Sequence, residues 1–320
     1  MHPMRLAPWL ALSLLGCAGT PPAPAPVTPA PTPVASARPS APAATAASAS
    51  PAPPPPASPA TPPYRDCGDG CKAFATSEAA FDFVLAEKPR VLAIGEAHAQ
   101  SGGPGGASST KRFMDQLLPR LAPRASDLVI ELWLANGSCG KVEQKVQKQQ
   151  QAVTAPQAAT NQNEFVELGH RAKAAGIMPH ALVPSCEQYQ KISSAGPNDV
   201  AEMLAMIKTV TQHDVETLLA QRGPERLIVA YGGAMHNDLV PREGRQDFSF
   251  GPDLKATTSD RYVELDLVIP EQIKDTEAWR SLPWYGHYSA EKAGNQALLY
   301  SWAPHAYALF FPTAKASPTP

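Results

Sequence analysis

From about Tyr64 onward, the sequence alternates between short aliphatic runs and longer stretches of helical character, and this alternation constrains the fold more than any other feature. Strands separated by helices predict a mainly parallel sheet with helices on both faces. The expected strands are residues 90–96, 127–132, 177–183, 226–233 and 262–269. The expected helices lie near residues 77–87, 108–121, 140–151, 163–175 and 199–221. The sequence therefore predicts a single α/β domain over residues 64–312.

The composition of each strand run indicates its place in the sheet. Residues 90–96, 127–132 and 226–233 are almost continuously aliphatic, which is typical of strands buried on both faces. Residues 262–269, YVELDLVI, alternate between apolar and polar, and we interpret them as an edge or antiparallel strand. The late run at 307–311, YALFF, favours the same interpretation. We therefore expect some antiparallel edge strands near the C-terminus.

The segment before this domain has a different composition. The chain contains 36 prolines, and many of them lie in residues 21–63, which are almost wholly Pro, Ala, Ser, Thr and Val with Arg38 as the only charge. Such a segment has too little bulky apolar surface to offset its ordering entropy, so it predicts a disordered tether that is partly polyproline II. Residues 313–320 are expected to form a disordered tail.

The first 20 residues have the layout of a secretory signal. Arg5 precedes an apolar stretch over residues 6–15, which is too short to span a membrane, and Gly16 and Cys17 follow it. This arrangement resembles a bacterial lipoprotein signal. The resemblance implies that Cys17 is lipidated and anchors the exported chain in the cell envelope, and Ala18 implies the outer membrane. An ordinary cleaved signal is the alternative.

Four cysteines remain beyond Cys17, and their even number predicts two disulfides in an exported chain. They are Cys67, Cys71, Cys139 and Cys186. The sequence leaves all three pairings open, although the first two cysteines are close enough to close a small loop. The Cys-x3-Cys spacing also resembles some zinc sites, but the second pair shows no matching spacing.

Several function classes are disfavoured by the sequence. The formal net charge is −2 and no Lys/Arg cluster is present, so nucleic-acid binding is not expected. Residues 101–111, SGGPGGASSTK, lack the Gly-Lys-Ser/Thr ending of a phosphate-binding loop. No Gly-x-Ser-x-Gly nucleophile elbow occurs, which disfavours a serine hydrolase.

Two similar motifs end expected strands with a histidine. VLAIGEAH ends at His98 and LIVAYGGAMH ends at His236, and in each the histidine stands three residues after a glycine. Glu96 lies two residues before His98, and Glu131 lies in the second strand run. Ligands of open α/β sheets bind beyond the carboxyl ends of the strands, so we expect these four side chains to converge there.

Imidazole and carboxylate groups together form a suitable first shell for Zn²⁺, Mn²⁺ or Fe²⁺. A coordination position left open would allow a water molecule to be activated for hydrolysis. We therefore expect His98, Glu131 and His236 to bind a divalent metal, with Glu96 as a further ligand or as the general base. Glu96 and His98 are the candidate catalytic residues.

The paired motifs Gly95–His98 and Gly233–His236, with a carboxylate after the second strand, resemble one superfamily. It contains the Tiki and TraB proteins, erythromycin-esterase-like hydrolases and ChaN-type haem-binding lipoproteins. The resemblance covers about residues 88–270. The Gly-Glu-x-His form, the lipoprotein signal and the segment VIELW are most similar to the ChaN-type branch. Tiki-like members imply divalent-metal hydrolysis at the two histidines and two glutamates, whereas the ChaN-type branch implies haem binding without a reaction.

The chain departs from both branches. After the first motif it continues with Ala99-Gln100-Ser101 rather than with the Asp-Asn and further histidines of ChaN-type proteins. The arginine of Tiki-like activity has no clear match, and Arg171 and Arg261 are the candidates for it. The expected function is that of a membrane-anchored lipoprotein with a metal-dependent hydrolase site for a small-molecule or peptide substrate. Haem binding without catalysis, with Tyr285 and His287 as reserve ligands, and a scaffold that binds neither group are the alternatives.

Overall fold

The computed structural model describes residues 62–103 and 105–313. The expected signal, Cys17, nearly all of the expected tether and residues 314–320 of the expected tail lie outside the described residues. Among the residues that are described, no helix combines the length and the apolar character needed to cross a membrane.

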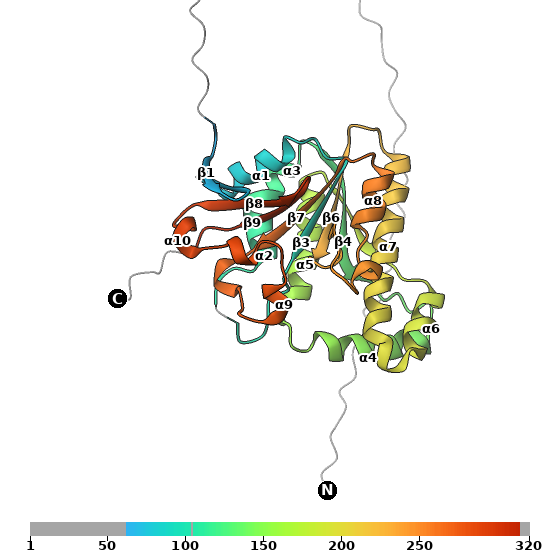
Figure 1. The fold of residues 1–320 in the computed structure, drawn as a ribbon. Helices are drawn as coiled ribbons and strands as arrows, with labels where there is room; N and C mark the ends of the chain where they lie inside the picture. The colour runs from blue at the N-terminus through green and yellow to red at the C-terminus, as the bar shows by residue number, and fades with distance from the viewer. Residues whose placement is uncertain (1–61, 104, 314–320) are drawn as a thin grey trace, which may run out of the picture. The chain divides into compact units, whose positions relative to one another are not determined.

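The described chain builds one nine-stranded sheet in the order β1-β2-β8-β9-β7-β3-β6-β4-β5 (Figure 1). The strands are β1 (Arg65–Gly68), β2 (Cys71–Phe74), β3 (Val91–Glu96), β4 (Ala125–Trp133), β5 (Met178–Leu182), β6 (Leu227–Gly233), β7 (Tyr262–Val268), β8 (Ala297–Ala303) and β9 (Ala306–Phe310). From β9 to β5 all neighbours are parallel, whereas β1, β2 and β8 pair antiparallel. The predicted α/β class, mainly parallel with antiparallel strands near the C-terminus, is confirmed. The β1–β2 hairpin was not predicted.

Helices cover both faces of this sheet, as expected. They are α1 (Ser77–Leu85), α2 (Ser109–Arg112), the π-helix η1 (Phe113–Leu117), α3 (Leu118–Leu121), α4 (Lys141–Thr154), α5 (Asn161–Ala174), α6 (Cys186–Ser194), α7 (Asp199–Gln221), α8 (Gly251–Thr257), α9 (Glu277–Arg280) and α10 (Ala290–Ala293). Leu92 and Ile94 of β3 pack into the core formed with α1, η1, α3 and α5. Val91 and Ala93 pack into the core formed with α6, α7 and α8. The aliphatic character of β3 therefore reflects burial on both sides.

The interpretation of residues 262–269 as an edge or antiparallel strand was wrong. β7 lies inside the sheet, parallel to both β3 and β9, and all seven of its residues are buried. Its polar positions, Glu264 and Asp266, are buried as well. The alternation marks acidic side chains held inside the protein rather than a face turned to water.

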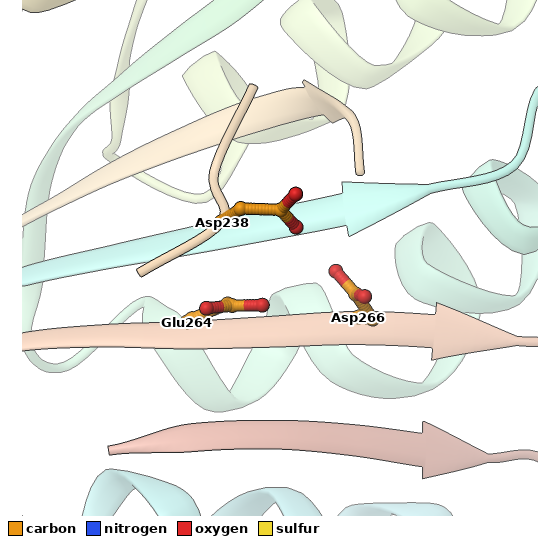
Figure 2. A group of neighbouring side chains, drawn as sticks. All are labelled: Asp238, Glu264 and Asp266. Atoms are coloured by element: carbon orange, nitrogen blue, oxygen red, sulfur yellow. The ribbon is translucent and has the colours of Figure 1, made fainter. Parts of the chain in front are cut away.

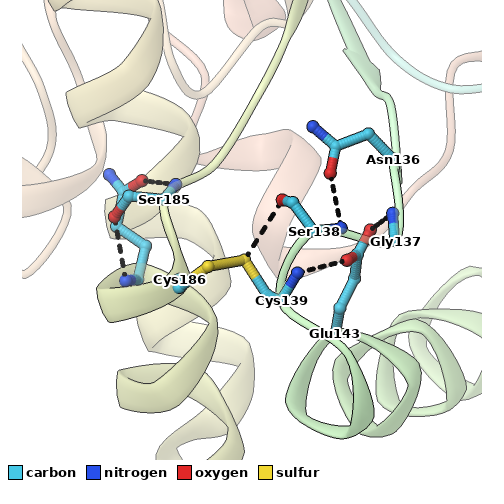
Figure 3. Close-up of a disulfide and its surroundings, with 8 residues drawn as sticks. Asn136, Gly137, Ser138, Cys139, Glu143, Ser185 and Cys186 are labelled. Atoms are coloured by element: carbon cyan, nitrogen blue, oxygen red, sulfur yellow. Dashed lines mark hydrogen bonds between the residues drawn. A yellow bond between two sulfur atoms is a disulfide. The ribbon is translucent and has the colours of Figure 1, made fainter.

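Two disulfides form, as the cysteine count predicted, and the structure settles their pairing. Cys67–Cys71 crosses the β1–β2 hairpin. Cys139–Cys186 joins the loop before α4 to the first residue of α6, 47 positions further along the chain (Figure 3). Next to this bond, the buried Glu143 of α4 accepts the backbone N–H groups of Gly137 and Cys139. The bond and this carboxylate together hold the start of α4 in place.

Candidate functional site

The structure brings the four predicted side chains together at one edge of the sheet. β3, β6 and β4 are neighbours, and the last residues of β3 and β6, Glu96 and Gly233, are paired in register. A Cβ placed on Gly233 would lie 3.4 Å from His98 Nε2, 3.6 Å from Glu131 Oε2 and 3.8 Å from His236 Cδ2. Both histidines and Glu131 therefore converge on one point beyond the strand ends.

Glu131 stands between the two histidines. Its Oε1 lies 4.0 Å from His98 Nε2 and 3.9 Å from His236 Nε2, while its Oε2 accepts the backbone N–H of Gly233 at 2.7 Å. The neighbouring Gly232 has no side chain to obstruct this carboxylate, whereas a Cβ there would lie 2.3 Å from Glu131 Oε2. The paired glycines of the second motif therefore make room for Glu131.

The backbone around His236 fixes which ring nitrogen carries the proton. Nδ1 of His236 lies 2.7 Å from the carbonyl oxygen of Phe248. Because a carbonyl oxygen can only accept, Nδ1 must donate its proton in this contact. The neutral ring then presents the free lone pair of Nε2 toward Glu131, which is the form of imidazole that binds metals.

Glu96 holds Nδ1 of His98 in a similar way. Nδ1 of His98 donates to Glu96 Oε1 at 2.6 Å, and the hydroxyl of Ser109 donates to the other oxygen of Glu96. Burial alone would lower the pKa of His98, but the hydrogen bond and the charge of Glu96, with the charge of Glu131, outweigh it and raise the pKa to about 9. Glu96 is 4% exposed and both of its oxygens are engaged.

The chemistry of this donor set suits a divalent metal. Two imidazole nitrogens and one carboxylate oxygen are offered, and each ring is fixed from behind by an acceptor, as is usual for metal-binding histidines. Metal–ligand bonds of about 2.0–2.1 Å in a tetrahedron separate the ligand atoms by roughly 3.3 Å. Glu131 Oε1 lies 4.0 and 3.9 Å from the two Nε2 atoms, but the three donor atoms do not all lie within 4.8 Å of one another, so the two imidazoles would have to move closer together to bind one ion.

A cavity of about 1080 Å³ opens over these donors. Its apolar wall comes from α7, with Val200, Met203, Leu204 and Ile207. Its other wall, from α4, α5 and the loop between them, carries six amide side chains: Gln147, Gln150, Gln151, Gln157, Asn161 and Gln162. No Lys or Arg of the described chain lines the cavity, and neither do Tyr285 and His287, the reserve haem ligands.

A second group of acidic residues was missed in the sequence. Asp238, Glu264 and Asp266 offer carboxylate oxygens that lie within 4.8 Å of one another (Figure 2). Burial raises the pKa of Asp238 to about 6, and burial with the charge of Asp238 raises the pKa of Asp266 to about 8. The signal was the pair of acids at alternate positions of an otherwise aliphatic run, which we interpreted as an edge or antiparallel strand.

Comparisons with known proteins give few matches. No protein-family model matches the chain, and no curated protein matches it by sequence. One solved structure, the type III effector HopBA1, is 11% identical with a TM-score of 0.39, covering 75% of this chain and 94% of its own. Another, ChaN of Campylobacter jejuni with cofacial haem binding, is 12% identical with a TM-score of 0.31, covering 58% of this chain and 85% of its own. Similarities this distant do not assign a function.

Proposed function

We propose that His98, His236 and Glu131 bind one divalent metal ion and that the domain is a metal-dependent hydrolase. One observation carries the proposal. The Nε2 atoms of both histidines are directed at the same carboxylate oxygen, while the Nδ1 atom of each ring is held by an acceptor behind it. Zn²⁺, Mn²⁺ or Fe²⁺ suits such a set of ligands.

Each side chain has a separate task in this proposal. A bound metal would supply a Lewis acid that polarises a substrate carbonyl and makes water more acidic. Glu96 keeps Nδ1 of His98 protonated and orients the ring, so we assign it a positioning role, because both of its oxygens are already engaged. The N–H of Gly233 holds Oε2 of Glu131, so that Oε1 faces the histidines. These contacts preorganise the ligands before substrate arrives.

The cavity over the site favours an uncharged substrate, either a small molecule or a peptide. Amide side chains can donate and accept hydrogen bonds, and the wall formed by α7 offers apolar contact. No Lys or Arg is among the described lining residues, so the bound metal would be the main partner for a phosphate or carboxylate group.

Haem binding is the second candidate, and the size of the cavity favours it, since about 1080 Å³ exceeds the usual range of small-molecule pockets. Two histidines at the cavity floor are available as iron ligands. The carboxylates of haem would find no basic side chain among the described lining residues. We therefore rank haem below a metal ion.

We also infer from the sequence that Cys17 is lipidated and anchors the domain in the outer membrane. This inference rests on the resemblance of the first 20 residues to a lipoprotein signal.

The first experiment measures bound metal in the full chain purified without chelator. Elemental analysis should find about one divalent metal ion per chain, and the variant His98→Ala/His236→Ala should hold almost none. The matched control is His170→Ala/His213→Ala, because both of these histidines are exposed on helices. Hydrolysis of neutral ester and amide substrates should be lost only in the first variant.

The same preparations distinguish the candidates. The hydrolase proposal is wrong if the first double variant keeps its metal and its activity. A saturable shift of the haem absorbance band in a chain that holds no metal would instead establish the haem-binding candidate.

A further inference from the structure

Adjacent to the candidate site, the sheet holds a second set of ligating side chains with different chemistry. Glu264 and Asp266 are two residues apart on β7 and share one face of the strand, and Asp238 reaches them from the segment after β6. Figure 2 shows the three side chains gathered beside β3 and β7. All of the donor atoms are oxygens, whereas the candidate site is dominated by imidazole nitrogens.

These carboxyl groups lack countercharges at contact distance. Glu264 is 1% exposed and Asp266 is 7% exposed, and in the described residues none of the three acids forms an ion pair. Within the described residues, the N–H of Leu239 donates to Glu264 Oε2 at 2.6 Å and the amide of Asn237 donates to Asp266 Oδ1 at 3.2 Å, while Arg242 and Arg245 act on the acids from beyond ion-pair distance. Buried carboxylates this close together require either protons or a cation.

An independent observation at Asn237 indicates a missing donor or cation. This residue is 2% exposed, and its Oδ1 has no hydrogen-bond partner. The amide cannot be turned over, because its Nδ2 donates to the backbone oxygen of Ala93, which can only accept. Asn237 therefore keeps a buried acceptor oxygen that no donor of the described residues satisfies.

That free oxygen lies beside the acidic group. Gly95 of β3 is paired in register with Asp266. A Cβ on Gly95 would lie 2.6 Å from both Asn237 Oδ1 and Asp266 Oδ1, so both oxygens lie in the space that a side chain at position 95 would occupy. A side chain at position 95 would displace them. Asp266 and Arg242 both line a cavity of about 200 Å³.

We propose that Asp238, Glu264 and Asp266, with the amide oxygen of Asn237, bind one hard divalent cation of the Ca²⁺, Mg²⁺ or Mn²⁺ type. Carboxylate and amide oxygens are the ligands that these cations prefer. The cation neutralises the buried acids and occupies the position that Asn237 Oδ1 faces. It lies beside β3 and β7, and we expect it to stabilise this part of the sheet.

The test uses Mn²⁺ alone as the probe, in the full chain carrying His98→Ala/His236→Ala, which removes the imidazole ligands of the other site. After dialysis against MnCl₂ and desalting, about one Mn²⁺ per chain should remain, and Mn²⁺ should raise the melting temperature. Adding Asp266→Asn or Glu264→Gln should weaken Mn²⁺ binding at least about tenfold and remove the thermal shift. The control Asp260→Asn changes an exposed carboxylate and should bind Mn²⁺ unchanged.

Each result decides the proposal. A chain with both histidines replaced that binds no Mn²⁺ overturns it, because the acids are then neutralised by protons. Binding that survives both Asp266→Asn and Glu264→Gln overturns it as well. If one of these variants fails to fold, the other decides, since each replaces a single ligand with an amide of the same shape. Loss of hydrolase activity plays no part, so failure here and failure of the proposed function are separable.

Discussion

At the scale of single residues, the sequence predicted which side chains form the candidate site, but not which groups hold those side chains in position. The two Gly-x-x-His motifs identified His98 and His236, because a glycine that follows an aliphatic run indicates that a strand is about to end. The groups that support the two rings come from later segments without a recognisable sequence pattern. Ser109 holds Glu96, which in turn holds His98, and the carbonyl of Phe248 holds His236. A backbone carbonyl in particular leaves no trace in a sequence.

Gly232 provides a test of how precisely Glu131 is placed. In Gly232→Ala the new Cβ would collide with the carboxylate of Glu131, so we expect metal affinity to fall at least about tenfold and stability by about 1–3 kcal/mol. Elemental analysis and urea denaturation measure the two effects.

Gly169→Ala is the matched control. Gly169 lies in α5, where a Cβ would make only an ordinary contact, 3.6 Å from Ile130 Cδ1. Alanine is also the better helix former, so this variant should be up to about 1 kcal/mol more stable to unfolding and should bind metal with unchanged affinity. Equal metal affinity in the two variants would contradict the role given to Gly232.

At the scale of helices and strands, most elements followed from hydrophobic periodicity, and β7 shows where the method failed. Alternation normally means that one face of a strand meets water, but Glu264 and Asp266 are held inside by contacts from Leu239 and Asn237. Those contacts depend on the segment after β6, which lies far away in the sequence. Local periodicity cannot distinguish a polar face turned to water from one turned to other polar groups.

Asp127 of β4 links three elements and predicts a pH effect. It is fully buried and accepts hydrogen bonds from Arg222 at the end of α7, at 2.7 and 2.8 Å, and from His180 of β5, at 2.9 Å. Burial alone would raise the pKa of Asp127, but the hydrogen bonds from Arg222 and His180 outweigh it and hold the pKa well below its usual value.

A lowered pKa means that Asp127 stabilises the fold above the pKa of an unfolded aspartate, about 3.9, and that this stability is lost as the pH falls further. Asp127→Asn should cost about 2 kcal/mol at pH 7, because Arg222 is partly exposed and retains its hydration. Urea denaturation should show that the difference in the free energy of unfolding between Asp127→Asn and the natural chain shrinks below about pH 4.

The exposed Asp253, paired with Lys208, gives the comparison for this effect. Asp253→Asn should change stability by less than about 0.5 kcal/mol at either pH. If Asp127→Asn lowers the free energy of unfolding as much at pH 3 as at pH 7, the buried charge of Asp127 does not stabilise the fold.

At the scale of the whole molecule, the alternation of strands and helices predicted the class of fold, but the cavity and the pairing of cysteines depend on tertiary structure. The cavity walls come from α4, α5 and α7, and only the folded chain brings these helices together over the strand ends. Four cysteines allow three pairings, and the choice depends on which loops meet. The distance between Cys139 and Cys186 in the sequence gave no indication of their contact.

The two disulfides should differ in their contribution to stability. In the chain-entropy description, closing the long loop between Cys139 and Cys186 stabilises the fold by about 4 kcal/mol, and closing the short Cys67–Cys71 loop by about 2 kcal/mol. Guanidinium denaturation of Cys139→Ser/Cys186→Ser should therefore show the larger loss, with Cys67→Ser/Cys71→Ser as its control. Equal losses would indicate that strain or unfolded-state structure outweighs loop length.

The Cys139–Cys186 bond also changes how a break in the polypeptide would be seen. The segment between these cysteines contains α4, α5 and the loop that joins them along the cavity. A protease that nicks this loop leaves each fragment with one of the two cysteines, so the pieces travel as a single band in a gel until a thiol separates them. Proteolytic cleavage beside the cavity would therefore not be detected on a gel run without a reducing agent.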